Sequence, residues 1–224
     1  MQKTFPCPPK AIIFDMDGLL VDSERLWTIA ETQLLAARGK QYDTNIHSAF
    51  IGLSLESLLA NVREAYQLED DVATLEDELH ERVMALLRAG VTVKPGANEI
   101  VDFVVQHNIP HAIASNSSEQ VIEATLSTIT WAHVFAIRCS VDHVEYGKPA
   151  PDIYQFAAEK VGIDPADCLA LEDSVNGVRA AVAAGMTCFA VPDLSHTTPD
   201  KFNDVTPHVF NDLHEALAQI HPCF

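Results

Sequence analysis

Residues 11–24 read Ala-Ile-Ile-Phe-Asp-Met-Asp-Gly-Leu-Leu-Val-Asp-Ser-Glu, and this stretch decides the fold. It opens with an unbroken apolar run that ends at Asp15, and a short apolar run bounded by a turn signal is typical of a buried β-strand. Strands that are apolar on both faces occur in parallel sheets covered by helices. We therefore predict a strand over 11–14, followed directly by a polar turn that carries Asp15 and Asp17.

The chain after residue 93 alternates short apolar runs with segments of helical periodicity. Such alternation predicts the α/β class, with a Rossmann-like doubly wound parallel sheet covered on both faces. Ser118 is a good helix N-cap, and Gly162 and Gly185 are typical helix stops. The predicted strands are 111–114, 134–137, 168–171, 187–191 and 208–209, and the predicted helices are 95–105, 118–129, 151–161 and 176–184.

Residues 23–92 interrupt this alternation. They lack β-rich runs, and their apolar residues recur at helical spacing, as in Leu75, Leu79 and Val83. An insertion of this kind between the first strand and the rest of the sheet predicts a helical cap domain. The core domain would then consist of residues 1–22 and 93–224.

The composition limits the partners of the chain. Its 14 Lys and Arg residues face 32 Asp and Glu residues, which gives a formal net charge of −18. Because phosphate backbones and anionic lipids recruit Lys and Arg, we expect no nucleic acid and no membrane partner. No large exposed apolar face is evident, so we expect a monomer. A charge of this sign also opposes a small anionic substrate, unless the binding site is locally positive.

The cysteines are scattered, odd in number and without a C-x-x-C pair. This pattern predicts buried or idle thiols rather than a disulfide framework or a zinc site. Residues 1–10 contain neither a long apolar region nor a small-residue cleavage site, so we expect no signal peptide and a cytoplasmic protein. The five cysteines are Cys7, Cys139, Cys168, Cys188 and Cys223.

Polar side chains follow several of the predicted strands at the point where each strand ends. Because the carboxyl ends of parallel strands meet at one edge of a sheet, we expect these side chains to converge there. Carboxylates that crowd together need a cation, and hard oxygen ligands favour Mg²⁺. The residues concerned are Asp15, Asp17, Ser115, Asn116, Lys148, Glu172 and Asp173.

Residues 15–24 resemble the first motif of the haloacid-dehalogenase (HAD) superfamily in its phosphatase form. Ser115-Asn116 is similar to the second motif, and Lys148 within Gly-Lys-Pro-Ala-Pro-Asp to the third. Leu171-Glu172-Asp173-Ser174, with Asn176-Gly177, is similar to the fourth. The motifs occur in order and cover nearly the whole chain, so the chain resembles the β-phosphoglucomutase-like and sugar-phosphatase subfamily, which has a helical cap.

This resemblance implies hydrolysis through an aspartyl-phosphate intermediate. Asp15 would be the nucleophile and Asp17 the general acid and base. The phosphoryl oxygens would be held by Ser115, the backbone amide of Asn116 and Lys148. Mg²⁺ would be held by the carboxylates of Asp15 and Asp173 and by the backbone carbonyl of Asp17. Glu172 would lie nearby as an alternate ligand or as an outer-shell residue.

Particular residues disfavour other chemistry known in the superfamily. Dehalogenases do not need the carboxylates of Asp17 and Asp173. β-Phosphoglucomutases carry an Arg in the cap loop just after a Gly-x-Ser, and the similar stretch here, Gly52-Leu53-Ser54-Leu55, has Leu55 at that position. They also carry a His where this chain has Trp27. Phosphonoacetaldehyde hydrolases need a cap lysine, and residues 23–92 contain only Lys40.

We therefore expect a Mg²⁺-dependent phosphatase that acts on a small phosphomonoester of a sugar, a polyol or a similar metabolite. The segments 22–27 and 170–177 are similar to hexitol and 2-deoxyglucose-6-phosphate phosphatases. Pseudouridine-5′-phosphatase is similar too, so a nucleotide-like substrate stays open beside a sugar. A phosphosugar mutase of the β-phosphoglucomutase type stays open as an alternative. So does a binding protein in which Asp15 is merely phosphorylated, although the full set of site residues disfavours it. Trp27 would either pack within the cap or face the leaving group. Arg25 would contact the substrate or hold the hinge, and we favour the hinge.

Overall fold

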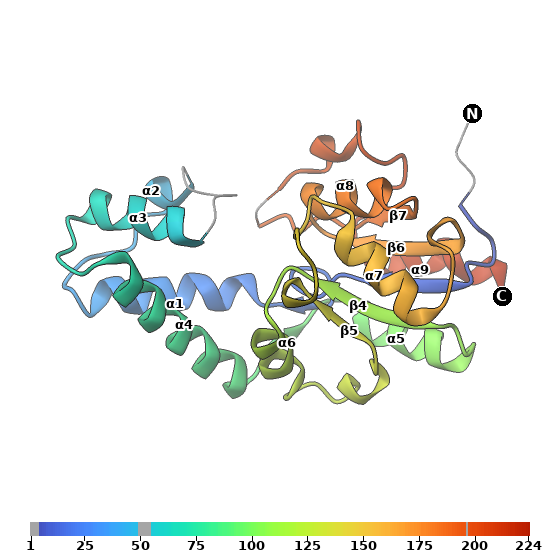
Figure 1. The fold of residues 1–224 in the computed structure, drawn as a ribbon, viewed down its shortest axis with the longest axis horizontal. Coiled ribbons are helices and arrows are strands. Elements are labelled where there is room, and N and C mark those ends of the chain that lie inside the picture. The colour runs from blue at the N-terminus through green and yellow to red at the C-terminus, as the bar shows by residue number, and fades with distance from the viewer. Residues whose placement is uncertain (1–4, 49–54, 196) are drawn as a thin grey trace.

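The computed structural model describes residues 5–48, 55–195 and 197–224, and its core contains a five-stranded parallel sheet (Figure 1). The strands lie in the order β5-β4-β1-β6-β7, so the first strand of the chain is at the centre. The strand bounds are β1 Ala11–Phe14, β4 His111–Ser115, β5 Arg138–Ser140, β6 Cys168–Glu172 and β7 Thr187–Ala190. This sheet confirms the predicted α/β class.

Successive residues of β1 point to opposite faces of the sheet and enter two different hydrophobic layers. Ile12 and Phe14 pack in the layer that contains α5, α6 and α9. Ala11 and Ile13 pack in the layer that contains α7 and α8. The core helices are α5 Ala97–Gln106, α6 Glu119–Leu126, α7 Asp152–Val161, α8 Val175–Ala183 and α9 Leu213–Ile220. Burial on both faces explains why the strands read as continuous apolar runs.

The strand predicted over 134–137 is wrong: the chain pairs with β4 only over Arg138–Ser140. Before it, Val134 ends the 3₁₀ helix η1 Ala132–Val134, and the ring centroid of Phe135 lies 5.6 Å from that of Phe14. The Ile137 carbonyl accepts from the Ile113 amide of β4 over 3.0 Å. The apolar composition of this run alone made it resemble a strand. Residues 208–209 likewise make a single bridge, between Ala190 and Val209, rather than a strand. The short 3₁₀ helices are η1 Ala132–Val134, η2 Val141–His143, η3 Pro165–Asp167, η4 Pro199–Phe202 and η5 His221–Cys223.

Among the described residues between β1 and α5, four helices form a lobe beside the core (Figure 1). They are α1 Glu24–Ala36, α2 Thr44–Ser48, α3 Leu55–Tyr66 and α4 Val72–Ala89. Their apolar stripes form a hydrophobic cluster of their own, which Val121 and Ala124 of α6 extend toward the core. The chain enters this lobe after β2 Val21–Asp22 and leaves it at β3 Thr92–Val93, and these two short strands pair antiparallel. The predicted boundary between core and cap domains, at residues 22 and 93, stays a prediction. The β2–β3 pair lies at this boundary, where a hinge between the two domains would be expected. No helix among the described residues is long and apolar enough to cross a bilayer.

The expectation that the cysteines are unpaired is wrong for two of them. Cys7 and Cys223 form a disulfide that joins segments 216 residues apart in the sequence. Spacing could not reveal this pair, because it depends on the N-terminal segment running beside the C-terminal turn. Cys139, Cys168 and Cys188 are buried free thiols, as expected.

Reduction of the Cys7–Cys223 disulfide is expected to lower the melting temperature by about 5–15 °C, because the bridge removes loop entropy from the unfolded chain. Differential scanning calorimetry with and without dithiothreitol measures the shift. The variant Cys7→Ser/Cys223→Ser should melt at the lower temperature under both conditions. An unchanged melting temperature in the variant would contradict a stabilising bridge.

Candidate active site

The turn after β1 fixes the two carboxylates of the first motif. The amide of Asp15 still donates to Leu171 of β6, and the chain then turns so that the Gly18 amide donates to the Val21 carbonyl over 2.8 Å. Gly18 has φ +84°, and a Cβ there would overlap the carboxylate of Asp173. Glycine is therefore required for the turn and for the close approach of Asp173.

The ammonium of Lys148 lies between two buried carboxylates. Its Nζ is 2.5 Å from Asp15 Oδ1 and 2.5 Å from Glu172 Oε1, and it also donates to the Ala114 carbonyl over 2.8 Å. Burial lowers the pKa of Lys148, but Asp15 and Glu172 raise it more, so it lies above its usual value. Lys148 is therefore a fixed cation directly beside the carboxylate predicted to be the nucleophile.

Glu172 is fully buried, and both of its oxygens are occupied. Oε1 accepts from Lys148 and from the hydroxyl of Tyr154 at 2.8 Å. Oε2 accepts from the amides of Asp173 and Ser174 and from the Ser174 hydroxyl, at 3.1–3.2 Å. A carboxylate held by this many donors is well suited to fix Lys148 in place, and less so to bind a metal directly.

Asp15, Glu172 and Asp173 can each offer an oxygen to one point, since these atoms lie within 4.8 Å of one another. Asp15 Oδ2 is buried without a hydrogen-bond partner. Burial raises the pKa of Asp173, and the neighbouring Asp15 and Glu172 raise it further. Three carboxylates against one ammonium leave excess negative charge and an orphaned oxygen, so the residues present fit a hard divalent cation such as Mg²⁺.

The carboxylate of Asp17 lies among hydroxyl groups. Ser23 donates to Oδ1 over 2.6 Å, and Ser115 and Ser117 donate to Oδ2 over 3.0 and 2.8 Å. Ser23 begins α1 without capping it, because its hydroxyl is used by Asp17. Sequence reasoning missed Ser23 and Ser117 as site residues. The position of Ser117, two residues after Ser115 at the end of β4, was the available signal.

Asn116 anchors the loop that carries Lys148. Its Oδ1 accepts from the Lys148 amide over 2.8 Å, and its Nδ2 donates to the Lys148 carbonyl over 3.2 Å. Gly147 lies so close that a Cβ there would come within 2.9 Å of Asn116 Oδ1. The structure thus brings together all seven residues predicted from the sequence. The phosphate-binding role of the Asn116 backbone amide stays a prediction.

A cavity of about 760 Å³ opens over these residues. Glu24 and Trp27 of α1 line it from the cap, and Trp27 also packs against the cap cluster. Arg25 is exposed and does not line the cavity, so its hinge role stays a prediction. Of the stretch 52–55, residues 52–54 lie outside the described residues, and Leu55 begins α3.

Asp193, just after β7, is a further site residue that sequence reasoning missed. It is buried, lines the cavity, and pairs with Lys94 over 3.0 Å. Burial raises the pKa of its carboxyl, but hydrogen bonds from Ser195 and Lys94 outweigh this and hold the pKa below its usual value. Lys94 follows β3, so the pair links the loop after β7 to the base of the cap. No spacing in the sequence links these two positions, which lie 99 residues apart.

Replacing Gly177 with Ala is expected to cost about 3 kcal/mol of stability, because the new Cβ would overlap the Glu172 carboxylate, which has no room to move. Urea denaturation measures this cost. Gly39→Ala is the matched control, since Gly39 has φ +68° and open space around it, so only backbone strain of about 1 kcal/mol applies there. Equal costs at the two positions would contradict the tight packing around Glu172.

Comparison with known proteins agrees with this geometry. Residues 12–191 match the family "Haloacid dehalogenase-like hydrolase". The chain is 35% identical to the Drosophila melanogaster protein named "Probable pseudouridine-5'-phosphatase", covering 94% of this chain and 90% of that one. It is 34% identical to hexitol phosphatase B of Escherichia coli K12, covering 87% and 86%.

Among solved structures, a HAD family hydrolase from Deinococcus radiodurans R1 with bound phosphate and sodium superposes with a TM-score of 0.82. It is 28% identical, and the match covers 97% of each chain. A β-phosphoglucomutase from Clostridium difficile shares the fold at 20% identity, with a TM-score of 0.76 over 96% of each chain. The chain belongs to the haloacid dehalogenase-like hydrolases and is a phosphoric monoester hydrolase of their β-phosphoglucomutase-like and sugar-phosphatase-like branch.

Proposed function

We propose that this chain is a Mg²⁺-dependent phosphatase that hydrolyses a small phosphomonoester, with Asp15 as its nucleophile. The observation that carries the proposal is the environment of Asp15. One of its oxygens is paired with Lys148, and the other is buried without a partner, beside Asp173. A carboxylate held in this way is aligned for attack and has an oxygen left for a cation.

In the first half of the reaction, an oxygen of Asp15 attacks phosphorus and the bond from phosphorus to the ester oxygen breaks. The leaving alkoxide takes a proton from Asp17. In the second half, Asp17 takes a proton from water, the resulting hydroxide attacks phosphorus, and the bond to Asp15 breaks. Lys148 and the Ser115 hydroxyl stabilise the phosphoryl oxygens. Asp15, Asp173 and the Asp17 carbonyl would hold Mg²⁺, which would supply positive charge that offsets the charge of the phosphate.

Glu172 is proposed as a positioning residue. Its two oxygens are occupied by five donors, so its task is to hold Lys148 and the turn after β6. The alcohol part of the substrate would lie against Glu24 and Trp27 of α1, which line the same cavity. Similarity to hexitol phosphatase B and to the pseudouridine-5′-phosphatase supports a sugar, polyol or nucleoside-like leaving group.

The test is phosphate release across a panel of sugar, polyol and nucleoside monophosphates, with Mg²⁺ and after treatment with EDTA. We expect turnover of at least one class, its loss on chelation, and its recovery when Mg²⁺ is restored. Full activity in excess EDTA would contradict the metal-dependent mechanism. Stable acyl-phosphate without turnover would favour the phosphorylated binding protein instead. Adding glucose 1,6-bisphosphate with a mutase assay tests the remaining alternative.

A further inference from the structure

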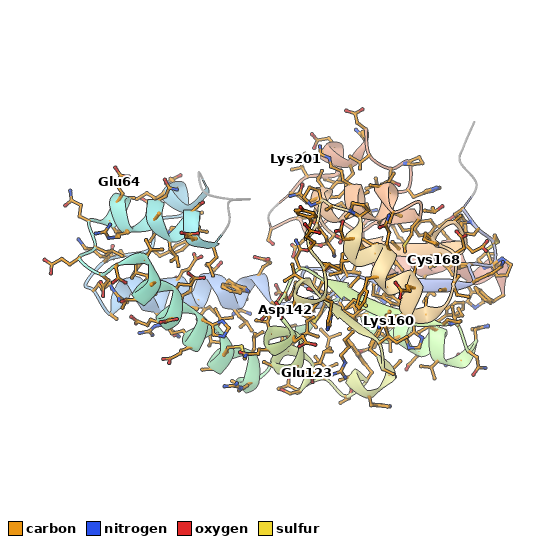
Figure 2. The ribbon with its side chains drawn as sticks, in the orientation of Figure 1. Glu64, Glu123, Asp142, Lys160, Cys168 and Lys201 are labelled. Atoms are coloured by element: carbon orange, nitrogen blue, oxygen red, sulfur yellow. A yellow bond between two sulfur atoms is a disulfide. The ribbon has the colours of Figure 1, made fainter. Side chains whose placement is uncertain are left out.

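Two cations, Arg179 of α8 and Lys201 of η4, line the catalytic cavity without an assigned task. Both side chains are exposed. Within residues 5–48, 55–195 and 197–224, neither side chain has an ion-pair or hydrogen-bond partner. Figure 2 shows Lys201 on the part of the core that faces the cap.

The other charged groups on the core side of this cavity are already engaged. Lys148 is paired with Asp15 and Glu172, and Lys94 neutralises Asp193. Asp15 and Asp173 belong to the proposed cation site. Arg179 and Lys201 therefore remain available to a ligand, in a chain whose 32 acidic residues outnumber its 14 basic ones.

The strand order places these cations on one side of the reaction centre. Asn116 and Lys148 approach Asp15 from the side of β4 and β5, whereas α8 follows β6 and η4 follows β7. Adjacent strands are about 4.8 Å apart, so β7 lies about 10 Å from β1 across the sheet. A substrate with its phosphate over Asp15 could thus extend toward Arg179 and Lys201, and this span suits a sugar acid or a sugar bisphosphate.

We propose that the leaving group carries a second anionic group, a carboxylate or a phosphate, and that Arg179 and Lys201 bind it. This rests on the proposed phosphatase function and narrows its substrate class. A guanidinium can hold either anion through two parallel hydrogen bonds, and a nearby ammonium adds charge without fixing geometry. The two cations would thereby discriminate among phosphomonoesters, because the site around Asp15 contacts only the phosphate that all of them share.

The test compares kcat/KM for matched substrates in the presence of Mg²⁺. One pair is 6-phosphogluconate and sorbitol 6-phosphate, which differ at the carboxylate. The other is fructose 1,6-bisphosphate and fructose 6-phosphate, which differ at the second phosphate. We expect the kcat/KM of the wild type to be higher for the doubly anionic member of at least one pair, by about 10-fold or more. The pair that shows this difference identifies the second anionic group as a carboxylate or a phosphate. In Arg179→Gln/Lys201→Gln this preference should fall at least about 10-fold.

Lys160→Gln is the matched control. Lys160 is an exposed lysine of α7 that lies over the Phe156 ring, 4.8 Å from its centroid, and does not line the cavity (Figure 2). The variant Lys160→Gln removes one positive charge, as each substitution of the double variant does, and should leave the preference unchanged. Wild-type ratios near one in both pairs, or a preference that survives in the double variant, would overturn the proposal.

Binding to the Asp15→Asn variant, measured by calorimetry, separates this proposal from the proposed function. Tighter binding of the doubly anionic ligand, lost on adding Arg179→Gln/Lys201→Gln, supports the anion site even if no substrate turns over. Equal affinities for both members of each pair would overturn the anion site while leaving phosphatase activity intact.

Discussion

Asp15→Asn is expected to lower kcat by at least about 10⁴-fold, because an amide oxygen cannot replace the attacking carboxylate. The substitution should not destabilise the folded state. Burial raises the pKa of Asp15, and the ammonium of Lys148 lowers it by less. A carboxyl whose pKa is raised on folding lowers stability at pH values above its unfolded pKa, so neutralising it relieves a cost at pH 7.

The metal-free Asp15→Asn variant should therefore melt at or above the temperature of the metal-free wild type at pH 7. Phosphate release and thermal melting, measured on the same preparations, check both parts. Asp142→Asn, at an exposed position of η2, is the control and should keep wild-type activity. Residual kcat within about 10-fold of wild type would exclude Asp15 as the nucleophile.

Lys148→Met is expected to reduce kcat/KM by at least about 10³-fold and to destabilise the fold by about 3–5 kcal/mol. The activity falls because the phosphoryl oxygens lose a cation. Stability falls because the Glu172 carboxylate, whose side chain is 0% exposed, keeps its charge without an ionic partner. Steady-state kinetics and urea denaturation of the metal-free protein measure the two losses.

The variant Lys148→Met/Glu172→Gln separates these two effects. Removing both charges should recover part of the stability, because Glu172 then carries no unpaired buried charge and Asp15 alone lacks its ionic partner, whereas activity should stay low. Recovery of activity together with stability would show that Lys148 acts only through the fold. No recovery of stability would contradict the buried pairing.

The strand ends were the part of the fold that sequence could predict best. Continuous apolar runs at 11–14, 111–114 and 168–171 became three adjacent strands, and the polar residues after them met at one edge of the sheet. The pattern works because the interior of a strand buried on both faces is apolar, so the first polar residue marks its carboxyl end, as Ser115 and Glu172 do. The run 134–137 satisfied the same rule and was not a strand, because Val134 belongs to η1 and Phe135 is buried against Phe14, and strand pairing with β4 begins at Arg138.

Contacts between distant segments were beyond sequence reasoning. The Asp193–Lys94 pair and the Cys7–Cys223 bridge depend on how loops cross after the sheet has formed. The local sequence is equally compatible with two roles for the Ser23 hydroxyl, capping α1 or donating a hydrogen bond to Asp17, and the structure shows the second. The detailed environment of Glu172, with donors on both oxygens, likewise followed only from the packed structure.

The net charge of −18 is compatible with an anionic substrate because the charge is unevenly distributed. Asp15, Glu172 and Asp173 form a site whose acidity suits a cation, and Lys148 lies within it. Exposed charges farther away are screened over about 8–10 Å. The acidity therefore opposes polyanions without excluding a small phosphorylated metabolite.

The most direct test of the mechanism is to trap the covalent intermediate. Asp17→Asn, turned over with p-nitrophenyl phosphate, should form the intermediate, because nitrophenolate leaves without a proton, and should hydrolyse it slowly. Acid quenching followed by borohydride reduction converts an aspartyl-phosphate to homoserine, which peptide mass spectrometry locates. We predict homoserine at position 15. Its appearance at another carboxylate, or its absence at every position while nitrophenolate is released in a burst, would contradict the account.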